Sequence, residues 1–258
     1  MIDYFKGKSI VITGATSGLG RNLAEKLLNY SANVAAIGRN KTALAELEAF
    51  AQNTPGKVLP LQCDVSEYEQ CKSAFEEIDR EFGKIDALIN NAGITNIAKF
   101  QSENSVEMTR NLFQINFFGA LNCTSLAYSH LLKSKGSIVN ISSVAGYSPL
   151  MGRTAYSASK HAMHGFFDTL RSELKEHDVH VMMACPTFIQ TGIRTETEQK
   201  VQGETLTPDY VSDRILKGIQ KRKRLLLIGK TATFAYWVNK LFPKTYEKIM
   251  IRNQKDKF

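Results

Sequence analysis

The sequence predicts an α/β fold in which a doubly wound parallel sheet of about seven strands carries helices on both faces. The first observation is that short runs rich in Val, Ile and Leu alternate with longer stretches whose apolar residues recur at helical spacing. The second is that these short runs are almost entirely apolar, as expected of strands that are buried on both faces. The length of 258 residues suits one fold of this kind.

The elements can be assigned in chain order. The expected strands are residues 9–13, 33–38, 57–63, 85–90, 137–142, 179–185 and 224–228. The expected helices are residues 19–30, 105–132, 155–177 and 208–221, with two more through Leu44, Leu47 and Phe50 and through Phe75, Ile78 and Phe82. Right-handed crossovers then give a Rossmann-type sheet, in which ligands bind beyond the carboxyl ends of the strands. Residues 187–207 have little periodicity and are expected to form a mobile loop.

The composition is ordinary for a soluble globular protein, with 43% hydrophobic and 22% charged residues. The N-terminus lacks the apolar core of a signal peptide, and no apolar run reaches the roughly 18 residues of a membrane-spanning helix. The four cysteines form no CxxC pair, so we expect a reduced, cytoplasmic location without a disulfide framework. His161 and His164 are three residues apart, but no third ligand accompanies them, and no metal is expected.

A glycine-rich turn joins the first strand to the helix that follows it. The turn reads Thr13, Gly14, Ala15, Thr16, Ser17, Gly18, Leu19 and Gly20. Glycines allow a tight turn and a close approach of backbone N–H groups to a phosphate, and the helix N-terminus adds partial positive charge. This placement predicts a site for the pyrophosphate of a dinucleotide.

The end of the second strand distinguishes between the two nicotinamide dinucleotides. An acid there would hold the ribose 2′-hydroxyl of NAD and repel the 2′-phosphate of NADP. The strand ends instead in Gly38, Arg39 and Asn40, and an arginine pairs well with a phosphate. NADP(H) is therefore expected as the cofactor in preference to NAD(H).

A tyrosine and a lysine lie four residues apart in the expected helix 155–177. Tyr156 and Lys160 therefore share one helix face, where the lysine ammonium favours the phenolate form of the tyrosine. A tyrosine tuned in this way can donate a proton to a carbonyl or accept one from an alcohol. Ser143 ends the fifth strand, 13 positions before Tyr156, and its hydroxyl is suited to hold the reacting oxygen, with the adjacent Ser142 as the alternative.

The glycine turn and the Tyr156–Lys160 pair resemble the motifs of the short-chain dehydrogenase/reductase superfamily, and the resemblance covers about residues 7–230. A second family motif is matched by Asn90, Asn91, Ala92 and Gly93. The resemblance implies a catalytic set of Asn116, Ser143, Tyr156 and Lys160, in which the asparagine holds a water that links the lysine to solvent. It implies cofactor contacts at Gly14, Thr16, Ser17, Gly18, Leu19, Gly20, Arg39, Asp64, Val65, Asn91, Ala92, Gly93, Tyr156, Lys160, Pro186, Ile189 and Thr191.

One position departs from the family pattern. After the sixth strand the family usually has Pro-Gly, whereas this chain has Pro186 followed by Thr187. The loop beyond is where the family builds a substrate lid, and Phe188, Ile189 and Ile193 are its apolar residues. Tyr147, Leu150 and Met151 are expected to line the opposite wall. Substrate contacts are thus expected at Ser143, Tyr147, Tyr156 and Phe188, and a hydrophobic carbonyl or alcohol is the expected substrate.

The net charge of +8 is concentrated near the C-terminus, where residues 217–258 contain 12 Lys/Arg and 2 Asp/Glu. Residues 231–258 are expected to be a basic amphipathic extension of the domain formed by residues 1–230. Apolar residues recur there at helical spacing with lysines on another side, and Pro243 is expected to kink or break the helix. Two interpretations stay open, namely peripheral attachment to an anionic membrane, and packing on the body or at an oligomer interface. The residues are Phe234, Trp237, Val238, Leu241 and Phe242, with Lys240, Lys244 and Lys248.

The predicted function is the NADP(H)-dependent interconversion of a carbonyl and a secondary alcohol on a hydrophobic or lipid-like substrate. One alternative is a 3-oxoacyl-carrier-protein reductase, because the basic residues 221–224 would suit an acidic carrier. An alternative of another class is an NADP(H)-binding regulator with little turnover. The resemblance implies a homodimer or homotetramer through the helices near 105–132 and 155–177, and no nucleic-acid partner is expected.

Overall fold

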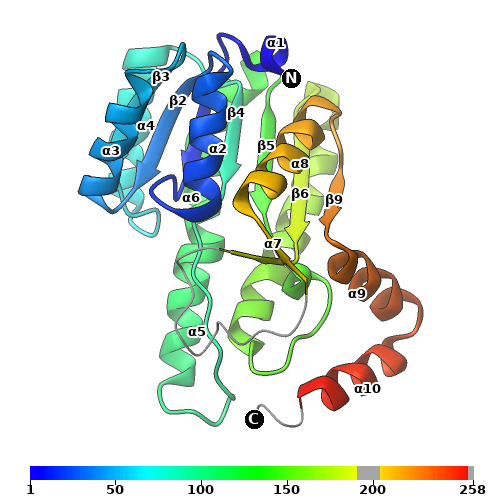
Figure 1. The fold of residues 1–258 in the computed structure, drawn as a ribbon. Coiled ribbons are helices and arrows are strands. Elements are labelled where there is room, and N and C mark those ends of the chain that lie inside the picture. The colour runs from blue at the N-terminus through cyan, green and yellow to red at the C-terminus, as the bar shows by residue number, and fades with distance from the viewer. Residues whose placement is uncertain (191–203, 255–258) are drawn as a thin grey trace.

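The computed structural model describes residues 1–190 and 204–254. Seven parallel strands form one sheet in the order β3-β2-β1-β4-β5-β6-β9 (Figure 1). The strands are β1 Ser9–Thr13, β2 Asn33–Gly38, β3 Lys57–Gln62, β4 Ala87–Asn90, β5 Ser137–Ile141, β6 His180–Pro186 and β9 Leu225–Ile228. The strand order reverses between β1 and β4, which makes a crevice at their carboxyl ends. The predicted fold class is confirmed.

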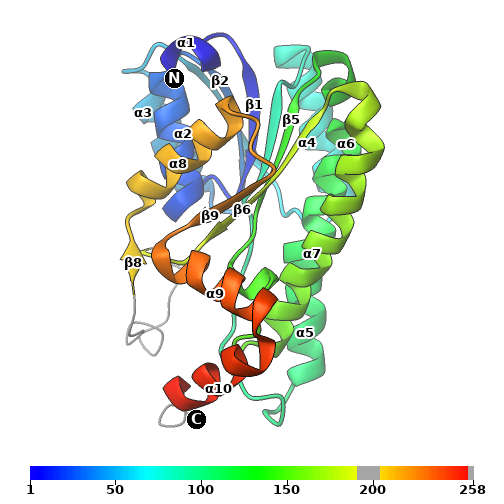
Figure 2. The same cartoon turned by 90° about the vertical axis from the view of Figure 1, so that its right-hand side faces the viewer.

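Helices cover both faces of the sheet, as Figure 2 shows. The helices on one face are α2 Gly18–Asn29, α3 Lys41–Ala51 and α8 Pro208–Gln220. Those on the other are α4 Tyr68–Phe82, α6 Gly119–Ser134 and α7 Thr154–Glu173. Successive side chains of a strand point to opposite faces, so Ile10 and Ile12 of β1 join the first core and Val11 joins the second.

The sheet edge explains one residue that is unusual in a strand. Pro60 lies within β3 and pairs with Ala36 of β2. Proline cannot donate a backbone hydrogen bond, and it is tolerated on edge strands, where one side has no ladder to complete. β3 is the first strand in the sheet order, so its other side carries no strand of this sheet.

The long helix expected over residues 105–132 is interrupted. The structure has α5 Ser105–Phe113, then a π-helical turn Gln114–Phe118, and then α6. A π-turn inserts one extra residue into the helical ladder, and such turns are frequent at functional sites. Asn116 lies in this turn. Apolar spacing over so long a stretch does not register a single inserted residue, which is why one continuous helix was expected.

The remaining differences are smaller. A short helix α1 Ile2–Phe5 precedes β1 and was not expected, and β4 begins at Ala87, two residues later than predicted. The expected loop 187–207 contains a two-stranded parallel sheet of β7 Phe188–Ile189 and β8 Thr205–Leu206. Short 3-10 turns follow β5 at Val144–Gly146 and follow α7 at Leu174–His177.

The C-terminal segment forms two helices that pack on the body. They are α9 Lys230–Leu241 and α10 Pro243–Gln254, so the chain breaks at Pro243 as predicted. Ala232, Ala235 and Tyr246 form a small core with Val144, which follows β5. Within the part of the chain that is described, no helix is both long and apolar enough to cross a membrane.

Candidate active site

The glycine turn after β1 packs against the segment that follows β4. Gly14 has a φ of +66°, and a Cβ there would lie 2.9 Å from Ala92 Cα. A Cβ on Gly20 would lie only 2.2 Å from Gly14 O. Both positions therefore need glycine, Gly14 for its backbone conformation and both for the close approach of the chain.

Hydrogen bonds join the same two segments. Thr13 Oγ1 accepts bonds from Asn91 N at 3.0 Å and Ala92 N at 2.9 Å. The Asn91 side chain donates in turn to Thr13 O and Gly14 O, at 3.0 and 3.1 Å. The glycine turn and the Asn90–Gly93 motif are thus joined by hydrogen bonds at the crevice between β1 and β4, where a dinucleotide would lie.

The N-terminus of α2 is open toward this crevice. Ser17 is the N-cap residue and is exposed, and its side chain makes no capping hydrogen bond. Leu19, by contrast, is 5% exposed and belongs to the core, so its backbone is the part available to a ligand. Gly38 lies next to Thr16, since a Cβ on Gly38 would be 2.4 Å from Thr16 Cγ2. The turn therefore reaches across to the end of β2.

Arg39 follows β2 and lies beside Asp64, which follows β3. The guanidinium Nη1 is 3.4 Å from Asp64 Oδ2. Burial raises the pKa of Asp64, but hydrogen bonds from Ser66 and the charge of Arg39 outweigh it and hold this pKa below its usual value. Val65 is buried against Gly119, so it presents mainly its backbone. Two predicted cofactor contacts, Arg39 and Asp64, are thus neighbours.

Tyr156 and Lys160 lie on one face of α7, as predicted. Lys160 is 4% exposed, and its Nζ donates a hydrogen bond of 2.8 Å to Ile141 O at the end of β5. The same Nζ lies 5.9 Å from the centre of the Tyr156 ring. Burial lowers the pKa of Lys160 to about 8, because desolvation penalises the ammonium. Lys160 therefore joins the carboxyl end of β5 to the helix that carries Tyr156.

Asn116 is 1% exposed, and its side chain bonds to protein atoms. Its Oδ1 accepts a bond from Ile94 N at 2.8 Å, and its Nδ2 donates to Ile94 O and Ser159 Oγ at 3.0 Å each. These bonds give Asn116 a structural role, and its predicted part in holding a water stays a prediction. Asn116 ties the segment after Gly93 to α7, next to Tyr156, whose carbonyl accepts from Ser159 at 2.8 Å.

The two serines after β5 have separate partners. Ser142 is buried, and its Oγ lies 2.9 Å from His164 Nε2 on α7. Ser143 is partly exposed, and its Oγ accepts a bond from Ala145 N at 3.3 Å. The hydroxyl of Ser143 can still donate to a ligand oxygen. Of the two residues, Ser143 is the one suited to contact a substrate.

In the segment after β6, Thr187 packs against a glycine, a contact that the sequence did not reveal. Thr187, which stands where the family has glycine, is 6% exposed. Opposite it, Gly229 has a φ of +105°, and a Cβ there would lie 2.6 Å from Thr187 Cγ2. The missing side chain at Gly229 makes room for Thr187. Pro186 ends β6 and Ile189 is half-buried in β7, whereas Thr191 and Ile193 lie outside the described residues.

Tyr147 and Phe188 were predicted to contact the substrate. The Tyr147 hydroxyl donates a bond of 2.9 Å to Ala232 O of α9, and burial raises the pKa of this phenol. Its oxygen therefore serves the packing of α9, and the predicted substrate contact rests on its ring alone. Phe188 is half-buried in β7, in the segment that follows Pro186.

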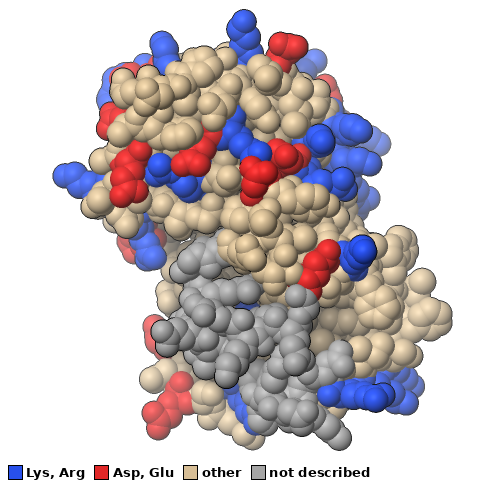
Figure 3. Space-filling view, in the orientation of Figure 1, with Lys and Arg blue, Asp and Glu red and all other residues tan. Residues whose placement is uncertain are grey.

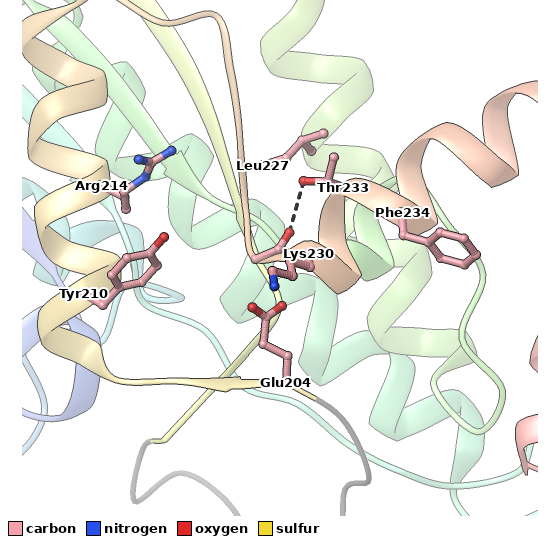
Figure 4. Close-up of a pocket in the computed structure, with 8 residues that line it drawn as sticks. Glu204, Tyr210, Arg214, Leu227, Lys230, Thr233 and Phe234 are labelled. Atoms are coloured by element: carbon pink, nitrogen blue, oxygen red, sulfur yellow. Dashed lines mark hydrogen bonds between the residues drawn. The ribbon is translucent and has the colours of Figure 1, made fainter.

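A pocket of about 520 Å³ opens between α8 and the start of α9 (Figure 4). Tyr210, Lys230 and Phe234 are among the residues that line it, and Phe234 points away from Glu204 and Lys230. Glu204 Oε2 accepts a bond of 3.2 Å from Thr231 N, so this carboxylate caps the positive end of α9. The described residues that line this pocket include none of the four predicted catalytic residues. It is a surface groove beside the end of β9.

His161 and His164 have separate partners. His161 Nδ1 lies 2.8 Å from Ser157 O on its own helix, while His164 faces Ser142. Within residues 1–190 and 204–254, no cluster of three His, Cys, Asp or Glu has the geometry of a metal site. His164 and Ser159 are the site residues that sequence reasoning missed. The spacing of His164 from Lys160, four residues, could have placed it on the catalytic face of α7.

The residues at the strand ends fit a nicotinamide dinucleotide. The open N-terminus of α2 suits the pyrophosphate, and the glycines leave room for it. Gly93 keeps space free in front of the catalytic groups, because a Cβ there would lie 3.1 Å from Asn116 Oδ1 and 3.7 Å from Lys160 Nζ. The fold and these strand ends define a dinucleotide-dependent oxidoreductase.

Comparison with known proteins identifies the family. The sequence profile described as short chain dehydrogenase matches residues 8–202, and the chain belongs to this family. It is 37% identical over 214 residues to 11-beta-hydroxysteroid dehydrogenase-like 2 of Arabidopsis thaliana, covering 83% of this chain and 69% of the relative. It is 33% identical over 268 residues to dehydrogenase/reductase SDR family member 7B of Bos taurus, covering 97% and 82%.

Solved structures agree with this assignment. A short chain dehydrogenase from Burkholderia cenocepacia in complex with NADP superposes with a TM-score of 0.84 at 25% identity, over 96% of this chain and 98% of the other. A short chain dehydrogenase/reductase from Burkholderia phymatum in complex with NAD gives the same TM-score and identity, over 93% and 95%. The protein is an NAD(P)-dependent oxidoreductase of the short-chain dehydrogenase family.

Proposed function

We propose that this protein interconverts a carbonyl and a secondary alcohol with NADP(H), and that its substrate is hydrophobic. The observation that carries the proposal is the joint placement of Tyr156 and buried Lys160 on one face of α7, beside the end of β5 that bears Ser143. A phenol, an ammonium and a hydroxyl that meet at the end of a strand are suited to hold and protonate an oxygen.

Each group has one role in this mechanism. Ser143 Oγ and the Tyr156 hydroxyl hold the carbonyl oxygen, and Tyr156 gives it a proton during reduction. The Lys160 ammonium favours the phenolate that remains, since an opposite charge nearby stabilises the charged form. Asn116 holds the segment around Ile94 against α7 and keeps these groups in register. NADPH, when bound, supplies the hydride.

Arg39 supports a preference for NADP(H). Its side chain is 66% exposed at the end of β2, where it can turn toward a phosphate. Asp64, the acid nearby, follows β3 and already pairs with Arg39. One of the two relatives is named as a hydroxysteroid dehydrogenase-like protein. That name, together with the apolar Phe188 and Tyr147, favours a bulky hydrophobic substrate.

The test follows NADPH and NADH oxidation with carbonyl compounds from short ketones to steroids and long-chain 3-oxo compounds. Wild-type turnover with NADPH that vanishes in Tyr156→Phe, while NADPH still binds, is the expected result. Turnover that persists in Tyr156→Phe would refute the assignment of the proton donor. Equal use of NADH would refute the cofactor preference.

A membrane surface is the partner that we propose for α9 and α10. α9 turns the small Ala232 and Ala235 inward, while Phe234, Trp237 and Leu241 are 50–59% exposed. Figure 3 shows the surface over these helices as largely uncharged, with Lys and Arg side chains along its lower edge. Exposed aromatic residues beside lysines suit the interface of an anionic bilayer.

Sedimentation with phosphatidylcholine vesicles, with and without phosphatidylserine, tests this partner. Trp237→Glu and Leu241→Glu should abolish binding to the anionic vesicles. Val106→Glu, at an apolar residue of α5 that is 56% exposed, should leave it intact. If all three variants sediment like the wild type, α9 does not bind the membrane.

We further propose a homo-oligomer through the helices on the α5–α6 side. Phe118 and Tyr128 are 41% and 37% exposed in this part of the chain, where their side chains are available for contact with a second copy. Light scattering on Phe118→Arg should report a smaller particle than the wild type, and an unchanged mass would exclude this face. The basic residues 221–224 precede β9 at the amino ends of the strands, opposite the site, which does not favour a carrier-protein substrate.

A further inference from the structure

One face of α7 carries three polar residues at intervals of four. They are Tyr156, Lys160 and His164, and residues at this spacing lie above one another on a helix. Lys160 and His164 contact two consecutive residues, the last residue of β5 and the one that follows it. Lys160 Nζ donates to Ile141 O at 2.8 Å, and His164 Nε2 lies 2.9 Å from Ser142 Oγ. Two adjacent bonds therefore hold α7 in register with β5.

The imidazole of His164 lies where three segments meet. Cys185 Sγ, at the end of β6, is 3.6 Å from Nε2. The ring of Tyr147 contacts the imidazole edge to face at a centroid distance of 6.2 Å. Gly146 leaves the necessary space, since a Cβ there would lie 2.7 Å from the imidazole. A residue enclosed in this way has little freedom to move, and neither does its partner Ser142.

Burial lowers the pKa of His164 to about 4, so the ring is neutral at physiological pH. A neutral imidazole has one donor and one acceptor nitrogen, and either arrangement of the proton can complete the bond to the Ser142 hydroxyl. The bond therefore persists over the range in which the enzyme would work. The role that follows for His164 is structural precision and not proton transfer.

Ser143 is in extended backbone with a φ of −162°, and Ser142 before it continues the pairing of β5 with β6 through an N–H bond of 2.8 Å to Ala184 O. Side chains of adjacent extended residues point to opposite sides. A Ser142 hydroxyl turned toward His164 accordingly leaves the Ser143 hydroxyl on the other side. Fixing one side chain of the pair fixes the direction of the other.

We propose that His164 is a positioning residue, which anchors Ser142 to α7 and thereby holds the Ser143 hydroxyl at its working distance from Tyr156. The inference rests on the proposed function, because Ser143 and Tyr156 act on one substrate oxygen there. The same face of α7 then fixes the positions of both reacting groups. It carries Tyr156 directly, and it holds Ser143 through His164. A misplacement of about 1 Å at such a site can cost about a hundredfold in rate.

The experiment compares His164→Leu, which removes the polar nitrogen, with His164→Gln, whose amide can replace Nε2. Ser142→Ala and the double variant Ser142→Ala/His164→Leu complete a cycle. The probe is NADPH oxidation with 9,10-phenanthrenequinone, a bulky apolar dicarbonyl. We expect His164→Leu to lower kcat about ten- to a hundredfold with an unchanged KM for NADPH. His164→Gln should recover most of the rate, and the double variant should be no slower than His164→Leu.

A second measurement does not depend on turnover. Hydrogen exchange of the amides of residues 142–148 in the NADPH-bound protein should be faster in His164→Leu than in wild type, and near wild type in His164→Gln. A wild-type kcat in His164→Leu would overturn the proposal, as would equal losses of kcat and melting temperature in both variants. If the wild type itself does not oxidise NADPH, the proposed function fails with this probe. Hydrogen exchange alone then tests whether His164 anchors Ser142. Unchanged exchange in His164→Leu then refutes the anchor.

Discussion

The Arg39 guanidinium lies 3.4 Å from the Asp64 carboxylate, across the neighbouring ends of β2 and β3. The two side chains differ in exposure, 66% for Arg39 and 26% for Asp64. The carboxylate is held by Ser66 through bonds of 3.0 and 2.8 Å, whereas the guanidinium extends into solvent. An exposed ion pair contributes little to stability. Asp64 therefore orients the Arg39 guanidinium, which remains able to exchange the carboxylate for a phosphate.

The first prediction concerns cofactor selection by Arg39. Arg39→Ala should raise the Kd for NADPH about ten- to a hundredfold, because a hydrogen bond to a charged group contributes about 1.5–3 kcal/mol. The Kd for NADH should not change, since NADH lacks the 2′-phosphate. Titration followed by the fluorescence of the reduced cofactors measures both constants. Arg39→Lys keeps the charge and loses the planar fork, so its Kd for NADPH should lie between those of the wild type and Arg39→Ala. Equal weakening of both cofactors would show that Arg39 does not read the phosphate.

The second prediction concerns the close approach at the glycine turn. Gly20→Ala should destabilise the protein by about 1–3 kcal/mol, because the added Cβ would lie 2.2 Å from Gly14 O and overpack the turn. Cofactor binding should weaken with it. Gly165→Ala is the matched control, since Gly165 is also helical and a Cβ there meets nothing within 4 Å. That variant should be stabilised by about 0.5–1 kcal/mol. Thermal unfolding compares the two, and a Gly20→Ala protein as stable as the control would contradict the packing.

Much of this architecture is predictable because it is local. Gly14, Gly18 and Gly20 mark the turn by their spacing, and Tyr156 and Lys160 share a helix face by theirs. The bond between Ser142 and His164 joins residues 22 positions apart and exists only once β5 and α7 are packed. Sequence spacing relates residues within one element, and it does not report which neighbouring element an outward side chain will meet.

The C-terminal helices show the same limit. The apolar spacing of α9 predicts a helix with an apolar side, but it does not say which side faces inward. The inward residues are Ala232 and Ala235, whose small size lets the helix approach Val144 closely. The bulky Phe234 and Trp237 are left outside. Of the two interpretations that the sequence left open, packing on the body applies to the small residues and does not account for the large ones.

The third prediction concerns Asn116. Asn116→Leu keeps the volume but leaves Ile94 N, Ile94 O and Ser159 Oγ without the bonds of 2.8–3.0 Å that they now share with its amide. A buried polar group that loses its partner costs about 1–3 kcal/mol, so a loss of about 3 kcal/mol or more is expected. Urea unfolding measures it. Asn29→Leu, at an exposed asparagine of α2 that bonds to Glu25 O at 3.0 Å, should change little. Similar midpoints for the two variants would mean that Asn116 does not hold Ile94.

The fourth prediction concerns pH and Lys160. Burial lowers the pKa of Lys160 in the folded protein to about 8, from its ordinary value of 10.5. Below pH 8 the lysine is protonated in both states, and between pH 8 and 10.5 only the unfolded chain keeps the proton. The unfolded state then binds more protons, so the contribution of Lys160 to the free energy of unfolding rises with pH across this window. A shift of this size corresponds to about 3 kcal/mol.

Lys160→Met removes this titration, so the stability of the wild type relative to Lys160→Met should increase from pH 8 to pH 10.5. Urea unfolding at several pH values, in the absence of cofactor, measures the difference. Lys240→Met, at an exposed lysine of α9, controls for the loss of one positive charge and should show no such trend. Over the same window carbonyl reduction should slow, because a neutral Lys160 no longer stabilises the Tyr156 phenolate. A difference between wild type and Lys160→Met that stays constant with pH would mean that Lys160 keeps its proton, and that burial at the end of β5 does not penalise the charge.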